Sequence, residues 1–186
     1  YFIRNNTTDY YNIFNDDEID TVIIATRHDS HAKLVAKSLD VGKNTFVEKP
    51  LALTKKELDN IKSSLNNNPS TLLHVGYNRR FSPHVQNVKK SIGDFHGPVN
   101  LIINMNAGYI PSEHWVHDLK IGGGRIIGEV CHLLDLCIFL SGSLIKSICC
   151  NHFGSDMNLN NDNVSIVINH HDGSNSSINY FSNGSK

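Results

Sequence analysis

Lys49 is the residue whose setting says most about chemistry. It stands between Glu48 and Pro50, directly after a short strand-like run over residues 45–47. A proline cannot continue ladder pairing, so the chain must turn at this point. A lysine fixed at the carboxyl end of a parallel strand points into the crevice where such sheets bind ligands, and its amine could transfer a proton there. Spacing alone also fits a surface lysine paired with Glu48.

His132 is the second candidate for acid–base chemistry. It lies in a strongly apolar segment, residues 127–140, which follows three consecutive glycines at 122–124. Glycines allow close approach of a backbone to a ligand in front of a helix N-terminus, and we expect His132 to face the same crevice as Lys49. A histidine in the core of an apolar helix is the alternative that the pattern leaves open.

Two histidine pairs have a spacing that could suit a metal ion. They are His28 with His31, and His114 with His117, the latter beside Asp118. A zinc site needs third and fourth ligands on rigid elements, whereas these pairs lie in loops or at a helix start. We therefore predict no metal site. Tyr109 and Trp115, in a loop with glycine and proline, are interpreted as walls of a pocket.

The elements that must position these residues alternate in the first part of the chain. A continuous apolar, β-branched run at 19–26 is typical of a parallel strand buried on both faces. Strand, helix, strand, helix and strand follow one another, which predicts right-handed crossovers and an α/β fold with a parallel sheet. The predicted elements after the first strand are a helix within 27–44, a strand at 45–47, a helix at 54–65 begun by a Thr54–Glu57 capping box, and a strand at 72–77. The segments beyond the strand ends, where ligands are expected, are 26–31, 48–50 and 76–80.

The order of elements changes in the second part. Successive strand-like runs after the apolar helix predict an α+β domain with a largely antiparallel, open sheet. We place the boundary between residues 80 and 81, which divides the chain into domains 1–80 and 81–186. An open sheet usually needs covering, so self-association of the protein through this sheet is expected. The predicted elements are helices at 82–92 and 127–140 and strands at 99–107, 144–152, 163–170 and 174–181.

Composition excludes several classes of protein. Seventeen Lys and Arg balance 18 Asp and Glu, so no broad basic face for nucleic acid is expected. No apolar run reaches the roughly 18 residues needed to cross a bilayer, and the start does not have the layout of a signal peptide, so a cytoplasmic protein without a membrane partner is expected. The four cysteines have no CxxC spacing and are interpreted as reduced, mostly buried thiols: Cys131, Cys137, Cys149 and Cys150.

Four segments together resemble a known family. They are ATRHDSHA at 25–32, GKNTFVEKPLALT at 42–54, VGYNRRFSP at 75–83 and GGGRIIGEVCHLLDL at 122–136. In this order they are similar to the Gfo/Idh/MocA oxidoreductases, the group of glucose–fructose oxidoreductase and inositol dehydrogenase. The resemblance covers nearly the whole chain and implies a partial Rossmann-type NAD(P)-binding domain followed by a substrate-binding domain.

The resemblance also implies an activity and a set of site residues. It implies hydride transfer between NAD or NADP and a secondary alcohol carbon of a sugar, cyclitol or nucleotide-sugar. Lys49 would polarise the reacting oxygen and His132 would exchange the hydroxyl proton. Cofactor contacts would come from Thr26, Arg27, His28, His31, Glu48, Lys49 and Asn78. Substrate contacts would come from Lys49, Arg79, Tyr109, Trp115 and His132.

Two departures from the family pattern qualify this expectation. Many members carry an aspartate four residues before the histidine, and this chain has Gly128 there, with Glu129 beside it but rotated by about 100° on an α-helix. A Lys–His pair without the aspartate is therefore expected. No GxGxxG follows any strand, so the phosphate turn is expected upstream of Tyr1 and the chain alone should bind the cofactor weakly or not at all. A non-catalytic regulator that senses a dinucleotide or a sugar is the alternative function.

Overall fold

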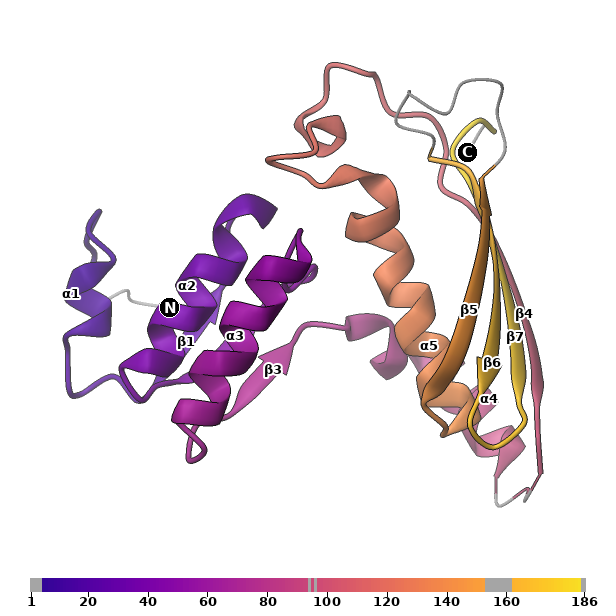
Figure 1. Cartoon of the computed structure of the whole chain (residues 1–186), viewed down its shortest axis with the longest axis horizontal. Coiled ribbons are helices and arrows are strands. Elements are labelled where there is room, and N and C mark those ends of the chain that lie inside the picture. The colour runs from indigo at the N-terminus through magenta and orange to yellow at the C-terminus, as the bar shows by residue number, and fades with distance from the viewer. Residues whose placement is uncertain (1–4, 94, 96, 153–161, 185–186) are drawn as a thin grey trace. The chain divides into compact units, whose positions relative to one another are not determined.

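The computed structural model describes residues 5–93, 95, 97–152 and 162–184 (Figure 1). The chain divides into two compact units, residues 1–76 and 77–186, each with its own core. In the part of the chain that the structure describes, no helix has the length and apolar character that crossing a membrane requires.

The first unit is a three-stranded parallel sheet with helices between its strands. The strand order is β1-β2-β3, and the register pairs Val22 with Thr45 and Thr45 with Leu73. Thr54 caps α3 through the predicted box, because its hydroxyl accepts from the backbone of Glu57 while the Glu57 carboxylate accepts from the backbone of Thr54. The elements are α1 (Tyr11–Phe14), β1 (Thr21–Ile24), α2 (His28–Asp40), β2 (Asn44–Val47), α3 (Lys55–Asn67) and β3 (Leu73–Val75). The alternating order predicted from the sequence is confirmed.

The core of the first unit lies on one face of its sheet. Val35 and Leu39 of α2 and Val47 of β2 are completely buried. In contrast, Ile23 is 72% exposed, and burial alternates along β1. The prediction that residues 19–26 form a strand buried on both faces is therefore wrong for this chain. An apolar sequence shows that both faces of a strand could be buried. Among the described residues, only the face that carries Val22 and Ile24 packs into the core.

The second unit carries a four-stranded sheet in the order β4-β7-β6-β5. The pairings β5–β6 and β6–β7 are antiparallel, as expected, while β4 pairs with β7 in parallel, so that the sheet is mixed. The predicted α+β domain with a largely antiparallel sheet is confirmed. The elements are the 3-10 turns Asn78–Phe81 and Trp115–His117, the helices α4 (Pro83–Ile92) and α5 (Cys131–Ser141), a π-helical turn at Ile126–Val130, and the strands β4 (Asn100–Asn106), β5 (Ile145–His152), β6 (Val164–His170) and β7 (Asn175–Phe181).

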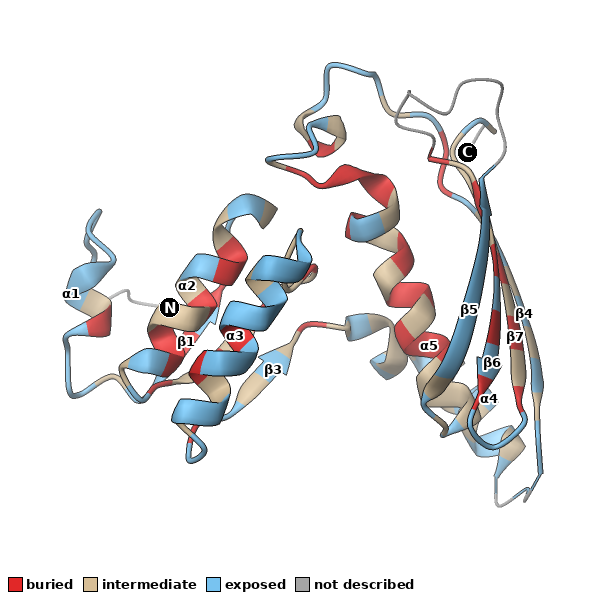
Figure 2. Cartoon of the chain, in the orientation of Figure 1, coloured by how far each residue is buried: buried red, intermediate tan, exposed pale blue. Residues whose placement is uncertain are grey.

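One face of this sheet packs against α5 and the other is open. Leu133, Leu136 and Cys137 of α5 form one core with Ile168 and Ile178 of the sheet. Figure 2 shows buried residues alternating along β6 and β7, whereas β5 is exposed along nearly its whole length. The open face is polar, with amide and hydroxyl groups bonded from strand to strand: Asn179 donates to Asn104 at 2.8 Å and Ser165 donates to Asn179 at 2.8 Å.

Two details differ from the sequence prediction. Of the four free cysteines, Cys149 and Cys150 are exposed on β5, so the thiols are not mostly buried. A doublet on an edge strand presents one side chain to each face, and neither face of β5 is covered there. The predicted helix 127–140 is α-helical only from Cys131, since a π turn precedes it. Such a turn closes i→i+5 hydrogen bonds and is wider than an α turn.

Candidate active site

The first group of predicted residues lies at the carboxyl ends of the parallel strands. The backbone N–H of Glu48 donates to the carbonyl of Ile24 at 2.9 Å, and that of Gly76 donates to the carbonyl of Val47 at 2.7 Å. These bonds continue the hydrogen-bond ladder of the sheet beyond the strands and hold the three strand ends in register. A side chain at position 76 would lie 3.2 Å from a carboxylate oxygen of Glu48, so glycine is what lets the third strand approach that carboxylate.

His31 joins two of these strand-end loops. Its ring is completely buried on α2, with Nδ1 2.8 Å from the carbonyl oxygen of Pro50 and Nε2 3.0 Å from that of Thr26. Both neighbours are carbonyl oxygens, which only accept, so the ring donates to them through the nitrogen that carries its proton. His31 therefore fixes the loop after β1 to the loop that carries Lys49.

The other predicted cofactor residues surround this clamp on the same edge of the first unit. Thr26 is exposed, with its hydroxyl 2.6 Å from that of Ser30, and Arg27 is the N-cap residue of α2. Lys49 and Glu48 are half-buried, and so is His28, the first residue of α2. The structure thus brings together a hydroxyl, a carboxylate and two cations in front of a helix N-terminus. Asn78 and Arg79 are not part of this group, because both belong to the second unit.

The second group surrounds His132 on α5. His132 is 6% exposed and Asp135, one helical turn further on, is 7% exposed. Both oxygens of Asp135 bind Arg80, one of them to Nε at 2.9 Å and the other to Nη2. The ring of Tyr77 meets that of His132 edge-on, with 6.0 Å between centroids. A cation, an anion, a phenol and an imidazole therefore share one end of an otherwise apolar helix.

Burial and hydrogen bonding shift the pKa values of Tyr77 and Arg80. It raises the pKa of Tyr77 to about 12, with the negative charges of Cys131 and Asp135 adding to the shift and Arg80 opposing it. The hydrogen bond to Asp135 raises the pKa of Arg80, and this outweighs the opposing effect of burial. Tyr77 is therefore a neutral hydroxyl, and Arg80 a permanent cation, over the whole range in which enzymes work. Arg79 beside them places Nη1 3.6 Å from the sulfur of Met105.

The triple glycine serves the packing of its own chain. A Cβ on Gly122 would lie 2.4 Å from the carbonyl oxygen of Val116, a distance that real structures do not show. Gly123 and Gly124 have φ values of 76° and 79°, which favour glycine strongly. The sequence predicted a close approach of these glycines to a ligand, whereas the structure shows Gly122 closely approaching the backbone of the loop that carries Trp115. Trp115 itself is half-buried, and its ring lies against that of His114 at 5.7 Å.

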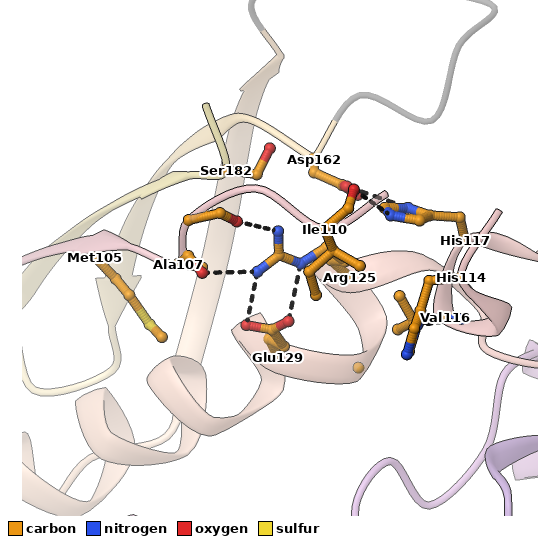
Figure 3. A network of polar contacts seen from close by, with 12 residues as sticks. Met105, Ala107, Ile110, His114, Val116, His117, Arg125, Glu129, Asp162 and Ser182 are labelled. Carbon is orange, nitrogen blue, oxygen red and sulfur yellow. Dashed lines mark hydrogen bonds and ion pairs between the residues drawn. The ribbon is translucent and has the colours of Figure 1, made fainter. Parts of the chain in front are cut away.

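Glu129 does not take the place of the missing aspartate. Its carboxylate accepts from Arg125 at 2.9 and 3.4 Å (Figure 3). Arg125 is 1% exposed and also donates to the carbonyls of Gly108 at 2.6 Å and Ala107 at 3.2 Å. Gly128 and Glu129 both lie in the π turn, so the four-residue spacing to His132 does not correspond to one α-helical turn.

The histidine pairs do not gather metal ligands. His117 Nδ1 lies 3.4 Å from a carboxylate oxygen of Asp162, and His114 accepts from the backbone of Val116. The ring centroids of His28 and His31 are 5.8 Å apart, and the His31 nitrogens face carbonyls. Among the residues that the structure describes, no group of three or more potential ligands could hold a metal ion.

The sequence of this chain is similar to that of known oxidoreductases. A model of the oxidoreductase family with an NAD-binding Rossmann fold matches residues 2–77. Inositol 2-dehydrogenase of Rhizobium meliloti is 33% identical over 126 residues, which are 67% of this chain and 37% of that protein. The scyllo-inositol 2-dehydrogenase (NAD(+)) of Bacillus subtilis is 32% identical over 143 residues, 75% of this chain and 40% of that protein. The chain belongs to the Gfo/Idh/MocA oxidoreductase family.

Solved structures of comparable fold extend the match over both units. Levoglucosan dehydrogenase in complex with NADH and levoglucosan superposes with a TM-score of 0.82 and 23% identity, over 97% of this chain and 52% of that one. At this identity the likeness establishes the fold alone. The chain spans about two fifths of the length of its curated Gfo/Idh/MocA relatives.

The edge of the first Gfo/Idh/MocA unit fits the nicotinamide half of a dinucleotide. A carboxylate such as Glu48 and a hydroxyl such as Thr26 are suited to ribose hydroxyls, and the glycine at 76 leaves the Glu48 carboxylate accessible to a close neighbour. The glycine-rich phosphate turn is not among residues 1–186.

Sequence reasoning missed the charged partners in the second unit. Arg80 and Asp135 were not singled out, although an aspartate inside the apolar run LLDL is a signal, because a buried charge needs a partner. The same argument applies to Arg125, which stands between three glycines and two isoleucines. No sequence signal identified Asp162 as the partner of His117.

Proposed function

We propose that the full-length protein containing this chain is an NAD-dependent dehydrogenase that oxidises a secondary alcohol of a sugar or cyclitol. The observation that carries the proposal is the position of Lys49, on a strand-end loop clamped by His31 beside Thr26 and Glu48. Relatives named inositol dehydrogenases, one of them with NAD(+) in its name, support both the substrate class and the cofactor. We place the first unit in cofactor binding and the second in substrate binding.

The cofactor would be held at the strand-end edge. Thr26, Arg27 and His28 would border it where β1 leads into α2, and Glu48 would accept hydrogen bonds from ribose hydroxyls. His31 would act indirectly, by holding the loop after β1 and the loop that carries Lys49 in fixed positions. From the second unit, Asn78 would complete the contacts. When bound, the nicotinamide supplies the chemistry of accepting a hydride from the alcohol carbon.

Lys49 and His132 would handle the oxygen and its proton. The Lys49 ammonium donates a hydrogen bond to the reacting oxygen and polarises it, while the ring of His132 accepts the hydroxyl proton. Pro50 limits the freedom of the lysine, so that its amine is held in one region. Arg79, Tyr109 and Trp115 would contact the remainder of the substrate. Because Glu129 is committed to Arg125, the catalytic pair would work without a carboxylate one turn before the histidine.

The open sheet face of the second unit supports a further part of the proposal, self-association of the protein. Ile102 and Val167, which share this face, are 70% and 41% exposed. Burying exposed apolar side chains favours association, and cross-strand amides offer hydrogen bonds to a second copy. A homo-oligomer in the cytoplasm is the form that we propose. Light scattering that finds only monomer at high concentration would contradict it.

The activity is tested with the full-length protein. NADH formation is followed by absorbance with myo-inositol, scyllo-inositol and D-glucose, and NADH binding is followed by its fluorescence. Lys49→Met should lower kcat/KM by roughly 10²–10⁴-fold and leave NADH binding within about threefold. Lys55→Met, at the exposed first position of α3, is the matched control and should leave both unchanged.

Two outcomes would overturn the proposal. Unchanged turnover in Lys49→Met would remove the lysine from the chemistry. NADH binding without turnover of any polyol would favour a dinucleotide-sensing regulator on the same fold.

A further inference from the structure

A cavity in the second unit lies outside the groups described around Lys49 and His132. Its volume is about 350 Å³, and it opens between three segments that are distant in the sequence. The first is the loop that follows β4. The second is the residue directly before the π turn. The third consists of the residues just before β6 and just after β7. The lining residues that matter are Tyr109, Ser112, His117, Arg125, Asp162 and Ser182. A pocket of this volume is large enough for one sugar ring.

Asp162 gives the cavity its chemical character. The residue is 8% exposed and its carboxylate lies 3.4 Å from Nδ1 of His117. It also accepts a hydrogen bond from the backbone N–H of Arg125. Burial raises the pKa of Asp162, while the charges of His117 and Arg125 oppose the shift. A carboxylate can accept about four hydrogen bonds, so Asp162 can serve its protein neighbours and still receive ligand hydroxyls.

Arg125 does not make the cavity an anion site. Its guanidinium is 1% exposed, and four acceptor atoms take its donors: two carboxylate oxygens of Glu129 and the carbonyls of Gly108 and Ala107 (Figure 3). Glu129 neutralises the charge of Arg125, which leaves the Asp162 carboxylate as the negative charge at the wall. A ligand carboxylate or phosphate placed there would be repelled by Asp162 and would meet a guanidinium with four of its five N–H donors already taken.

The rest of the wall suits an uncharged polyol. Ser112 and Ser182 carry hydroxyls that donate and accept. Both nitrogens of His117 face protein groups, Nδ1 the carboxylate of Asp162 and Nε2 the carbonyl of Ile110 at 3.3 Å, so this ring holds the wall in place. Tyr109 is 73% exposed and follows Gly108, whose φ of 69° turns the chain at this point. An exposed aromatic ring at the rim of a polar pocket can cover the C–H face of a sugar.

We infer that this cavity binds a neutral, hydroxyl-bearing unit of the substrate, with Asp162 accepting from two neighbouring hydroxyl groups. The inference rests on the proposed function and narrows it, because it selects neutral sugars and cyclitols over sugar acids and nucleotide-sugars at this position. Asp162 is a substrate-positioning residue in this scheme and His117 holds its carboxylate, both separate from the proton chemistry of Lys49 and His132.

The test is direct binding to the full-length protein, measured by saturation-transfer NMR without any turnover. The probes are methyl α-D-glucopyranoside, myo-inositol and maltose, with the methyl glycoside of D-glucuronate as the matched anion. At least one neutral probe should bind, and the anion should bind at least tenfold more weakly than its neutral counterpart. Asp162→Asn should weaken binding of that neutral probe roughly 10–100-fold, as expected for losing hydrogen bonds to a charged acceptor.

Controls separate binding from folding. Asp172→Asn removes a carboxylate in the exposed turn between β6 and β7 and should bind the probe like the wild type. Ser182→Leu fills the cavity without touching a charge and should also abolish binding, while circular dichroism reports whether each variant is folded. Binding that survives both Asp162→Asn and Ser182→Leu, or no binding of any neutral probe, would overturn the inference. Loss of turnover in Lys49→Met with probe binding intact would leave it standing, so that it can fail separately from the proposed activity.

Discussion

The two units handle their chemically important groups in opposite ways. In the first, Thr26, Glu48 and Lys49 are exposed or half-buried, and the loops that carry them are fixed by backbone bonds and by the buried His31. In the second, each ion pair has one buried member, Asp135 in its pair with Arg80 and Arg125 in its pair with Glu129. A site made of exposed groups on rigid loops tolerates substitution of those groups, whereas a site made of buried pairs depends on both members for stability.

The largest effect is therefore expected at Arg125. Arg125→Met keeps the volume but leaves the Glu129 carboxylate and two carbonyls without their donor, which should cost about 3–5 kcal/mol of unfolding free energy. Trp115 is the only tryptophan and belongs to the second unit, so urea unfolding followed by its fluorescence reports this unit. Lys90→Met on exposed α4 is the control. A loss below about 1 kcal/mol would show that the pair contributes little to the stability of the fold. Replacing both members, in Arg125→Met/Glu129→Leu, should recover part of the lost stability, because no unpaired carboxylate remains.

The first unit should show its largest loss at His31 rather than at a charged residue. His31→Leu removes the ring nitrogens that face the Thr26 and Pro50 carbonyls, at an expected cost of about 1–3 kcal/mol. The variant should also bind NADH more weakly, because the Lys49 loop is no longer tied to the loop after β1. Urea unfolding followed by circular dichroism gives the first quantity and NADH fluorescence the second. His74→Gln on the exposed part of β3 should change neither, and equal effects of the two variants would remove His31 from the site.

The same contrast explains what could be predicted from the sequence. The strand-end rule located Lys49, Glu48 and Thr26, because their positions depend on local pattern and on the topology of a parallel sheet. The capping box at Thr54 and the order of helices and strands also follow from local pattern. These features needed no knowledge of contacts between distant segments.

The buried pairs could not be predicted in this way. Arg80 and Asp135 are 55 residues apart, and only the docking of α5 brings them together. The same holds for His117 with Asp162, and for the parallel pairing of β4 with β7 across an insertion of a helix and two strands. The π turn before α5 is invisible to an argument that assumes α-helical spacing, and it changes which residues share a face with His132.

Helix caps give a smaller comparison between the units. Thr54→Ala removes the bond from the backbone N–H of Glu57 to the Thr54 hydroxyl, and with it the reciprocal pairing of the capping box of α3, and should cost about 1 kcal/mol. Ser82→Ala removes one bond of 3.3 Å at the start of α4 and should cost about 0.5 kcal/mol. Thermal or urea unfolding of the two variants against the wild type measures the order, and a larger loss for Ser82→Ala would reverse it.

Tyr77 should have the smallest effect at neutral pH and a visible one in alkali. Its pKa is raised from 10.0 to about 12, so the folded state keeps the phenol proton where the unfolded state loses it. Unfolding is therefore favoured as pH rises through the interval from 10 to 12. Tyr77→Phe should unfold like the wild type at pH 8 and lose less stability over that interval. An identical pH profile for both proteins would contradict the assignment.

In the proposed mechanism, an amine from the first unit and an imidazole from the second act on one hydroxyl group. A double-mutant cycle on the full-length protein tests this most directly. The measurement is kcat/KM for polyol oxidation in the wild type, Lys49→Ala, His132→Ala and the double variant. Residues that work as a unit are strongly non-additive, so the double variant should be no more than about tenfold worse than the poorer single variant. Two losses that simply multiply would mean that Lys49 and His132 act independently, and the proposed catalytic pair would have to be abandoned.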